Sequence, residues 1–203
     1  MSSLMLFSLD ALVSISKMYR NALVRACDGA LDEKDASTML GDRGQDVLGV
    51  IRAVFGRDPA LAERLSKERV EEQVFATLHQ GVHGCAHEEA YRALRDYKNA
   101  GYATGVFFAI EEPVLERVVK SAKLRVDLIA GQERGESVKD IILKAVDRSR
   151  MSEFYLVTAS VTKIPDDIKE YVAEKRKRVK VLSALKTSQY SLEGLREQLE
   201  SQE

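Results

Sequence analysis

The chain has 203 residues, a formal net charge of −1 and 45% hydrophobic residues. This length suits one large domain or two small ones, and the balanced charge excludes a protein that binds nucleic acid through overall positive charge. Two cysteines give no disulfide framework, which is typical of a reducing compartment, so we expect a cytoplasmic protein. The longest apolar stretch, residues 4–15, is shorter than the roughly 20 residues that span a bilayer, and we expect no membrane association.

Residues 4–27 form the first predicted element, a long amphipathic helix. Leu9, Leu12, Met18 and Leu23 approximate one apolar stripe along it. The stripe is wide, so we expect this helix to be buried on much of its surface or to form the interface of a homo-oligomer. Further helices are predicted as far as Asn99, and residues 1–102 are therefore interpreted as a helical region.

All three histidines of the chain lie within nine residues, together with one of the two cysteines: His79, His83, Cys85 and His87. On an unbroken helix the three histidines would share one face, a spacing that suits a metal site. Gly81 and Gly84 favour the alternative, in which the histidines lie at helix ends and the cysteine is a small buried side chain. We expect no other cofactor.

Residues 87–99 predict a helix that ends at Gly101, followed by a short apolar strand. Arg92, Arg95 and Lys98 fall along one side of this helix. The pattern resembles the recognition helix and wing entry of winged-helix regulators, within residues 69–110, and the resemblance implies that the three cations contact DNA. The alternative is an amphipathic helix with a solvated basic edge.

Strand and helix patterns alternate after residue 103. We predict strands at residues 106–110, 124–130, 154–160 and 179–185, with helices that begin near Pro113, Ser137 and Pro165. Such alternation predicts a mostly parallel sheet with right-handed crossovers. The fold class is therefore α/β: a helical region, a four-stranded α/β domain over residues 103–186, and a charged C-terminal helix over residues 187–203.

Two segments of the α/β region could bind anions. The first is the loop that precedes a helix start after the second predicted strand, and its candidate residues for a small anionic ligand are Gly131, Arg134, Gly135 and Ser137. The second is the basic block that could contact phosphate, Lys175, Arg176, Lys177 and Arg178. The alternatives are plain turn chemistry for the loop and a solvated helix end for the block.

Residues 137–185 are similar to the second half of phospholipase-D-like domains, through AVDRS at a helix end, the strand FYLVTAS and the segment KRKRVKVLSA. Active members use a His-x-Lys motif, and no histidine follows His87, so the resemblance implies a non-catalytic version. A winged helix followed by such a domain resembles the TrmB-type regulators. This order predicts a non-enzymatic regulatory protein that binds DNA or a small ligand.

Two other functions remain open. Asp127, in the segment RVDLI, resembles the metal-binding aspartate of restriction-endonuclease-like folds. These nucleases also need a Glu-x-Lys motif on the next strand, and residues 132–152 predict no such strand, so a nuclease would be degenerate. The other alternative is a helical interaction or assembly protein that forms an oligomer through residues 4–27.

Overall fold

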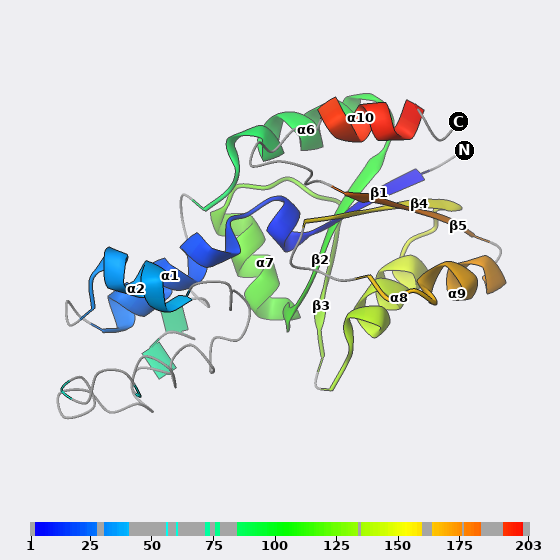
Figure 1. The fold of residues 1–203 in the computed structure, drawn as a ribbon. Coiled ribbons are helices and arrows are strands. Elements are labelled where there is room, and N and C mark those ends of the chain that lie inside the picture. Colours follow the sequence, from blue (N-terminus) through cyan, green and yellow to red (C-terminus); the bar gives the residue numbers. More distant parts are fainter. Residues whose placement is uncertain are drawn as a thin grey trace.

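The computed structural model describes residues 3–27, 31–40, 85–133, 135–159, 164–175, 177–183 and 193–200, with six further positions between residues 56 and 77. A parallel sheet of five strands organises this part of the chain, in the order β3-β2-β1-β4-β5 (Figure 1). Its strands are β1 (Ser3–Ser8), β2 (Ala103–Glu111), β3 (Leu128–Gln132), β4 (Glu153–Thr158) and β5 (Arg178–Ser183).

Helices cover both faces of the sheet (Figure 1). One face packs against α6 (Glu88–Asn99) and α7 (Glu112–Ser121), together with α10 (Glu193–Glu200). The other face packs against α8 (Val138–Arg148) and α9 (Ile168–Glu174). Because successive side chains of a strand point to opposite faces, β1 divides between the two cores: Met5 and Phe7 join the first, and Leu4 and Leu6 join the second.

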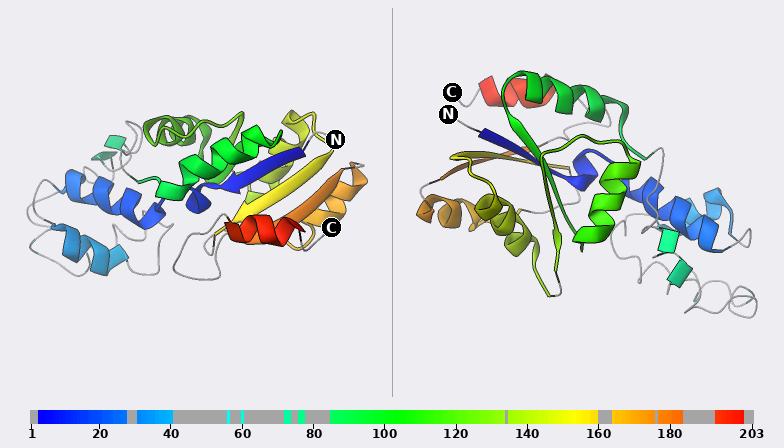
Figure 2. Two further views of the ribbon diagram at one scale, coloured as in Figure 1. Left: turned by 90° about the horizontal axis from the view of Figure 1, so that it is seen from above. Right: turned by 180° about the vertical axis from the view of Figure 1, so that it is seen from behind.

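A helical insert separates β1 from α6. A short 3-10 helix, η1 (Leu9–Ala11), follows β1, and α1 (Ile15–Ala26) and α2 (Glu33–Leu40) come next. Figure 2 shows α1 and α2 to one side of the sheet rather than across one of its faces. None of the helices in the described part of the chain is both long and apolar enough to cross a bilayer.

The prediction of a single helix over residues 4–27 is wrong in its first half. Residues 3–8 form the central strand β1, and the helix α1 begins only after Ser14, whose hydroxyl caps it. A strand buried on both faces has no polar alternation, so its apolar run resembles part of a helical stripe. The sheet consequently has five strands, not four, and the fold does not begin with a helical region.

The α/β class and the parallel sheet are confirmed. The four predicted strands overlap β2, β3, β4 and β5, although the observed β3 begins at Leu128, four residues later than predicted. Ser137 caps α8 as expected, within a capping box in which it exchanges hydrogen bonds with Asp140. Gly101, at φ +88, takes the left-handed conformation that ends α6.

Candidate active site

The strand order changes direction next to the central strand, and we refer to the region outside the carboxyl ends of β1 and β4 as the crevice. β1 pairs with β2 on one side and with β4 on the other, and the chain reaches β4 only after completing β2 and β3. Successive strands are therefore added on one side of β1 as far as β3 and then on its other side from β4 onward. In open parallel sheets, ligands bind outside the carboxyl ends of the strands at such a reversal.

Three buried polar side chains gather at these strand ends. Phe7 of β1 pairs with Val157 of β4, so the residues that follow, Ser8 and Thr158, end neighbouring strands side by side. Asp10 lies two residues further along in η1 and is only 6% exposed. The backbone N–H of Ala159 donates to the Ser8 hydroxyl at 3.4 Å, which ties the end of β4 to the end of β1.

These three side chains make up half of the buried polar set in the described residues. The other members are Ser3, Thr104 and Ser149. Ser3 and Thr104 lie near the opposite, amino ends of β1 and β2, and Ser149 follows the C-terminal end of α8. Since burial of polar groups is costly unless they have partners or a function, their concentration at the crevice marks it as the candidate site.

The two chain segments that join the insert to the sheet are paired beside this crevice. Val13 and Ala86 form an antiparallel bridge. The Ser14 N–H donates to the Cys85 carbonyl at 2.8 Å, and the His87 N–H donates to the Leu12 carbonyl at 2.9 Å. We refer to residues 12–14 and 85–87 as the clasp. It fixes where the insert meets the end of β1.

The His87 side chain reaches from the clasp to the crevice, where it forms a hydrogen bond with the backbone of Asp10. Burial lowers the pKa of His87 below its usual value, and this outweighs the bond to Asp10 and the charges of Asp10 and Glu89, which raise it. The imidazole is therefore neutral at pH 7. The neutral ring keeps one N–H to donate.

Side chains that could bind a metal do not cluster in the described part of the chain. The described residues contain no group of three or more His, Cys, Asp or Glu side chains placed to hold a metal ion. Of the four residues predicted to form a metal site, Cys85 and His87 belong to the clasp, and His79 and His83 lie outside the described residues.

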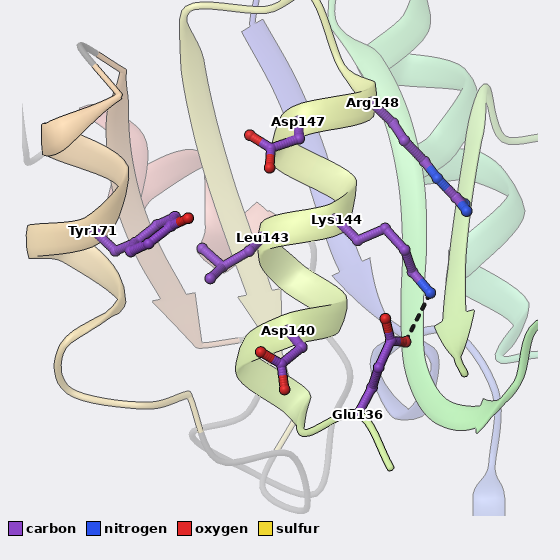
Figure 3. Close-up of a pocket in the computed structure, with 7 residues that line it drawn as sticks. All are labelled: Glu136, Asp140, Leu143, Lys144, Asp147, Arg148 and Tyr171. Carbon is purple, nitrogen blue, oxygen red and sulfur yellow. Dashed lines mark hydrogen bonds and ion pairs between the residues drawn. The ribbon is translucent and has the colours of Figure 1, made fainter. Parts of the chain in front are cut away.

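A second concentration of charge lies between the ends of β2 and β3 and the helix α8. Figure 3 shows Lys144 and Arg148 on one side of α8, with Lys144 directed at Glu136. The Lys144 Nζ lies 2.8 Å from Glu136 and 3.2 Å from Glu133, and Arg148 donates to both oxygens of Glu112, at 2.8 and 2.9 Å. We refer to Glu112, Glu133, Glu136, Lys144 and Arg148 as the charge cluster.

The charges of the cluster pair with one another, although Glu136, Lys144 and Arg148 also line a pocket on this side of α8 (Figure 3). Burial would raise the pKa of Glu112, but the hydrogen bonds from Arg148 and from the Gly131 N–H lower it below its usual value. Gly131 has no room for a side chain, since an added Cβ would lie 2.3 Å from the Cα of Glu112. This close approach of two backbones, at the first residue of the predicted anion loop, explains the glycine there.

The other predicted anion-binding residues have local roles or lie outside the described residues. Gly135 adopts φ +85 in the turn, and Ser137 caps α8. Lys175 pairs with Asp147 at 3.5 Å, and the Lys177 Nζ donates to the backbone carbonyls that end α8. Arg178 belongs to β5, while Arg134 and Arg176 lie outside the described residues.

The three cations predicted to contact DNA lie on the exposed side of α6. Arg92 and Arg95 are exposed there, and Arg95 lies 3.5 Å from Asp96. The Lys98 Nζ lies 2.8 Å from Asp127. After α6 the chain enters β2, which pairs in parallel with β1 and β3, whereas a wing requires an antiparallel hairpin.

The sequence reading missed Ser8 and Asp10. Once residues 4–15 were interpreted as part of one helix, Asp10 became an interruption on its surface. The signal that could have found them is the short apolar run that ends in Ser8-Leu9-Asp10, since a polar residue directly after a buried strand lies at its carboxyl end.

Comparison with known proteins identifies the fold. No protein-family model matches the sequence, and no curated protein matches it. Solved structures do match over nearly the whole chain. An L-2-haloacid dehalogenase superposes with a TM-score of 0.61 at 12% identity, covering 98% of this chain and 100% of its own. A hydrolase from Streptococcus pneumoniae gives 0.57 at 15% identity, covering 97% of each chain.

A protein assigned as a phosphatase from Clostridium difficile gives a TM-score of 0.59 at 12% identity, covering 97% of this chain and 90% of its own. These likenesses show that the chain has the fold of haloacid-dehalogenase-like hydrolases. The resemblance to winged-helix and TrmB-type regulators is therefore wrong. The prediction of a non-enzymatic, DNA-binding regulatory protein is overturned as well, because the solved structures that share this fold are a hydrolase, a protein assigned as a phosphatase and a dehalogenase.

The two alternative functions, a degenerate nuclease and a helical assembly protein, are also not supported by the structure. A restriction-endonuclease-like nuclease would need Asp127 in a metal site, but Asp127 precedes β3 and pairs with Lys98. The assembly reading depended on one long helix over residues 4–27, and that segment is divided between β1 and α1.

Proposed function

We propose that this chain is a hydrolase of small phosphate esters, with its active site in the crevice at the carboxyl ends of β1 and β4. The observation that carries the proposal is the gathering of Ser8, Asp10 and Thr158 at the reversal of strand order, while the other buried polar residues of the strands, Ser3 and Thr104, lie near the opposite ends. The substrate class is that of the phosphatase among the similar structures.

Asp10 is the residue that we assign to proton transfer. A carboxyl group at the crevice can give a proton to the oxygen of the leaving alcohol and can recover one from the attacking water. Net hydrolysis then breaks the bond from phosphorus to the ester oxygen and forms a bond from phosphorus to the water oxygen. Ser8 is fully buried beneath the crevice and accepts a hydrogen bond from Ala159, so we assign it the role of joining the two strand ends.

The proposal is tested with p-nitrophenyl phosphate and a panel of small phosphate monoesters, with 2-haloacids included as a separate class. We expect the purified wild-type chain to release phosphate, and Asp10→Asn to reduce kcat by about 10²–10⁴-fold, the range for loss of an acid–base group. Asp166→Asn, at an exposed position before α9, is the matched control and should leave kcat unchanged.

Two results would overturn the proposal: a wild-type chain that hydrolyses no phosphate ester in the panel, or an Asp10→Asn variant as active as the wild type. If the wild type releases halide but no phosphate, the substrate class is a haloacid and not a phosphate ester. Circular dichroism of each variant shows whether a lost activity reflects lost folding.

A further inference from the structure

Although its position makes His87 the N-cap of α6, its side chain serves another element. An N-cap side chain ordinarily accepts a hydrogen bond from the first turn of its own helix. The His87 side chain makes no such capping bond. It bonds to the backbone of Asp10 in η1 instead.

The direction of this bond follows from its effect. The bond raises the pKa of His87, and a hydrogen bond raises the pKa of an imidazole when the ring donates to a carbonyl. The ring N–H of His87 therefore donates to the Asp10 carbonyl, while its backbone N–H donates to the Leu12 carbonyl at 2.9 Å. One residue thus holds two carbonyls of the segment that carries Asp10.

We propose that His87 is a positioning residue, which fixes the backbone of Asp10 through its imidazole and so couples the clasp to the crevice. The inference rests on the role proposed for Asp10. The orientation of the Asp10 side chain therefore depends on how residues 85–87 of the clasp lie against η1. The charged groups that face the imidazole are Asp10 from η1 and Glu89 from α6.

The first test measures the hydrogen bond without using activity. The Ala11 amide shares its peptide unit with the Asp10 carbonyl, so its ¹⁵N chemical shift responds to a bond at that carbonyl. We expect His87→Leu, which has no donor, to move the Ala11 ¹⁵N shift away from the wild-type value. Glu88→Gln, in the first turn of the same helix, is the control and should leave the shift in place.

The second test uses p-nitrophenyl phosphate as the probe. We expect His87→Leu to lower kcat about tenfold with little change in KM, the effect of weakening one hydrogen bond that positions a catalytic group. The variants His87→Asn and His87→Gln each keep a side-chain N–H. At least one of them should have a kcat close to that of the wild type. Rescue by an amide separates a donor role from simple packing. If His87→Leu does not fold, His87→Met, which has the length of Gln without its N–H, replaces it.

The outcomes separate this inference from the proposed function. A donor-free variant with wild-type kcat and an unmoved Ala11 shift overturns the role of His87, while the assignment of Asp10 stands. Equal losses in the Leu and amide variants also overturn it, because a packing role then explains the data. A wild-type chain without phosphatase activity overturns the proposed function, and the Ala11 shift still decides whether His87 holds the Asp10 carbonyl.

Discussion

Lys98 and Asp127 join α6 to the segment that precedes β3, with 2.8 Å between the Lys98 Nζ and the Asp127 Oδ1. The other oxygen of Asp127 accepts from the backbone N–H and the hydroxyl of Thr104, at 2.9 and 3.1 Å. Burial would raise the pKa of Asp127, but the bonds from Lys98 and Thr104 lower it below its usual value. Lys98, predicted to contact DNA, and Asp127, considered as a nuclease metal ligand, thus form an ion pair with each other.

Replacement of Asp127 by Asn should destabilise the fold by about 0.5–1 kcal/mol at pH 7, the lower part of the range for a charged hydrogen bond, because the side chain is 46% exposed. A group with a lowered pKa stabilises the fold above its unfolded pKa and ceases to do so as the pH falls through its folded pKa. The deficit of Asp127→Asn should therefore shrink below about pH 4.

Urea denaturation of both chains between pH 3 and pH 7 measures this deficit. Asp166→Asn is the control, and its stability should follow the wild type at every pH. A deficit in Asp127→Asn that stays constant across this range would contradict an ionic origin.

Gly131→Ala should be among the most damaging single-methyl additions in the chain. The new Cβ would lie 2.3 Å from the Cα and 2.6 Å from the backbone nitrogen of Glu112, and neither atom can move without displacing the start of α7. We expect a loss of about 2–3 kcal/mol in the free energy of unfolding, the range for overpacking of a rigid site. Gly194→Ala in α10, where nothing lies within 4 Å, should leave stability equal or slightly higher.

Urea midpoints of these two alanine variants provide the comparison. A Gly131→Ala chain as stable as Gly194→Ala would show that the segments at Glu112 and Gly131 are not in close contact. An intermediate effect is expected for Gly135→Ala, where space is free but φ is +85.

Lys144→Met should expose the repulsion within the charge cluster. Lys144 lies 2.8 Å from Glu136, 3.2 Å from Glu133 and 3.8 Å from Glu112, and only 15% of its side chain is exposed. Removing this cation leaves neighbouring carboxylates with less compensation, and we expect a loss of about 1 kcal/mol at low salt. Thermal unfolding should show the loss diminishing in high salt, where screening weakens the repulsion, and at a pH below the lowered pKa values of Glu112 and Glu136, where protonation removes it.

Lys169→Met, at an exposed position on α9, is the matched control for this variant. Its stability should match the wild type under all of these conditions. An Lys144→Met deficit that does not respond to salt or to pH would indicate a loss of packing instead of a loss of charge pairing.

Local signals in the sequence were sufficient for the second half of the fold. Ser137, Pro113 and Gly101 mark helix ends through rules that involve only neighbouring residues, and each marks an end in the structure. The order of strands and helices after residue 103 follows from the same signals. The class of the fold was therefore predictable without knowledge of distant contacts.

The central strand and the candidate site depend on distant contacts. Leu4 and Leu6 read as members of a helical stripe because burial on both faces removes the alternation that identifies a strand. Asp10 gains its meaning only from the position of β4 beside β1. The glycine at position 131 looked like part of a ligand loop because the neighbouring backbone of Glu112 is 19 residues away in the chain.

The central position of β1 also has a consequence for biosynthesis. Leu4 is synthesised well before its partners Ala103 and Phe154. Until then β1, which is apolar from Leu4 to Phe7, has two unpaired edges, the type of segment that associates with other chains. Pairings this far apart in sequence also slow folding. We therefore expect newly made chains to depend on chaperones that hold β1, and truncation before β4 to yield aggregates rather than a smaller folded protein.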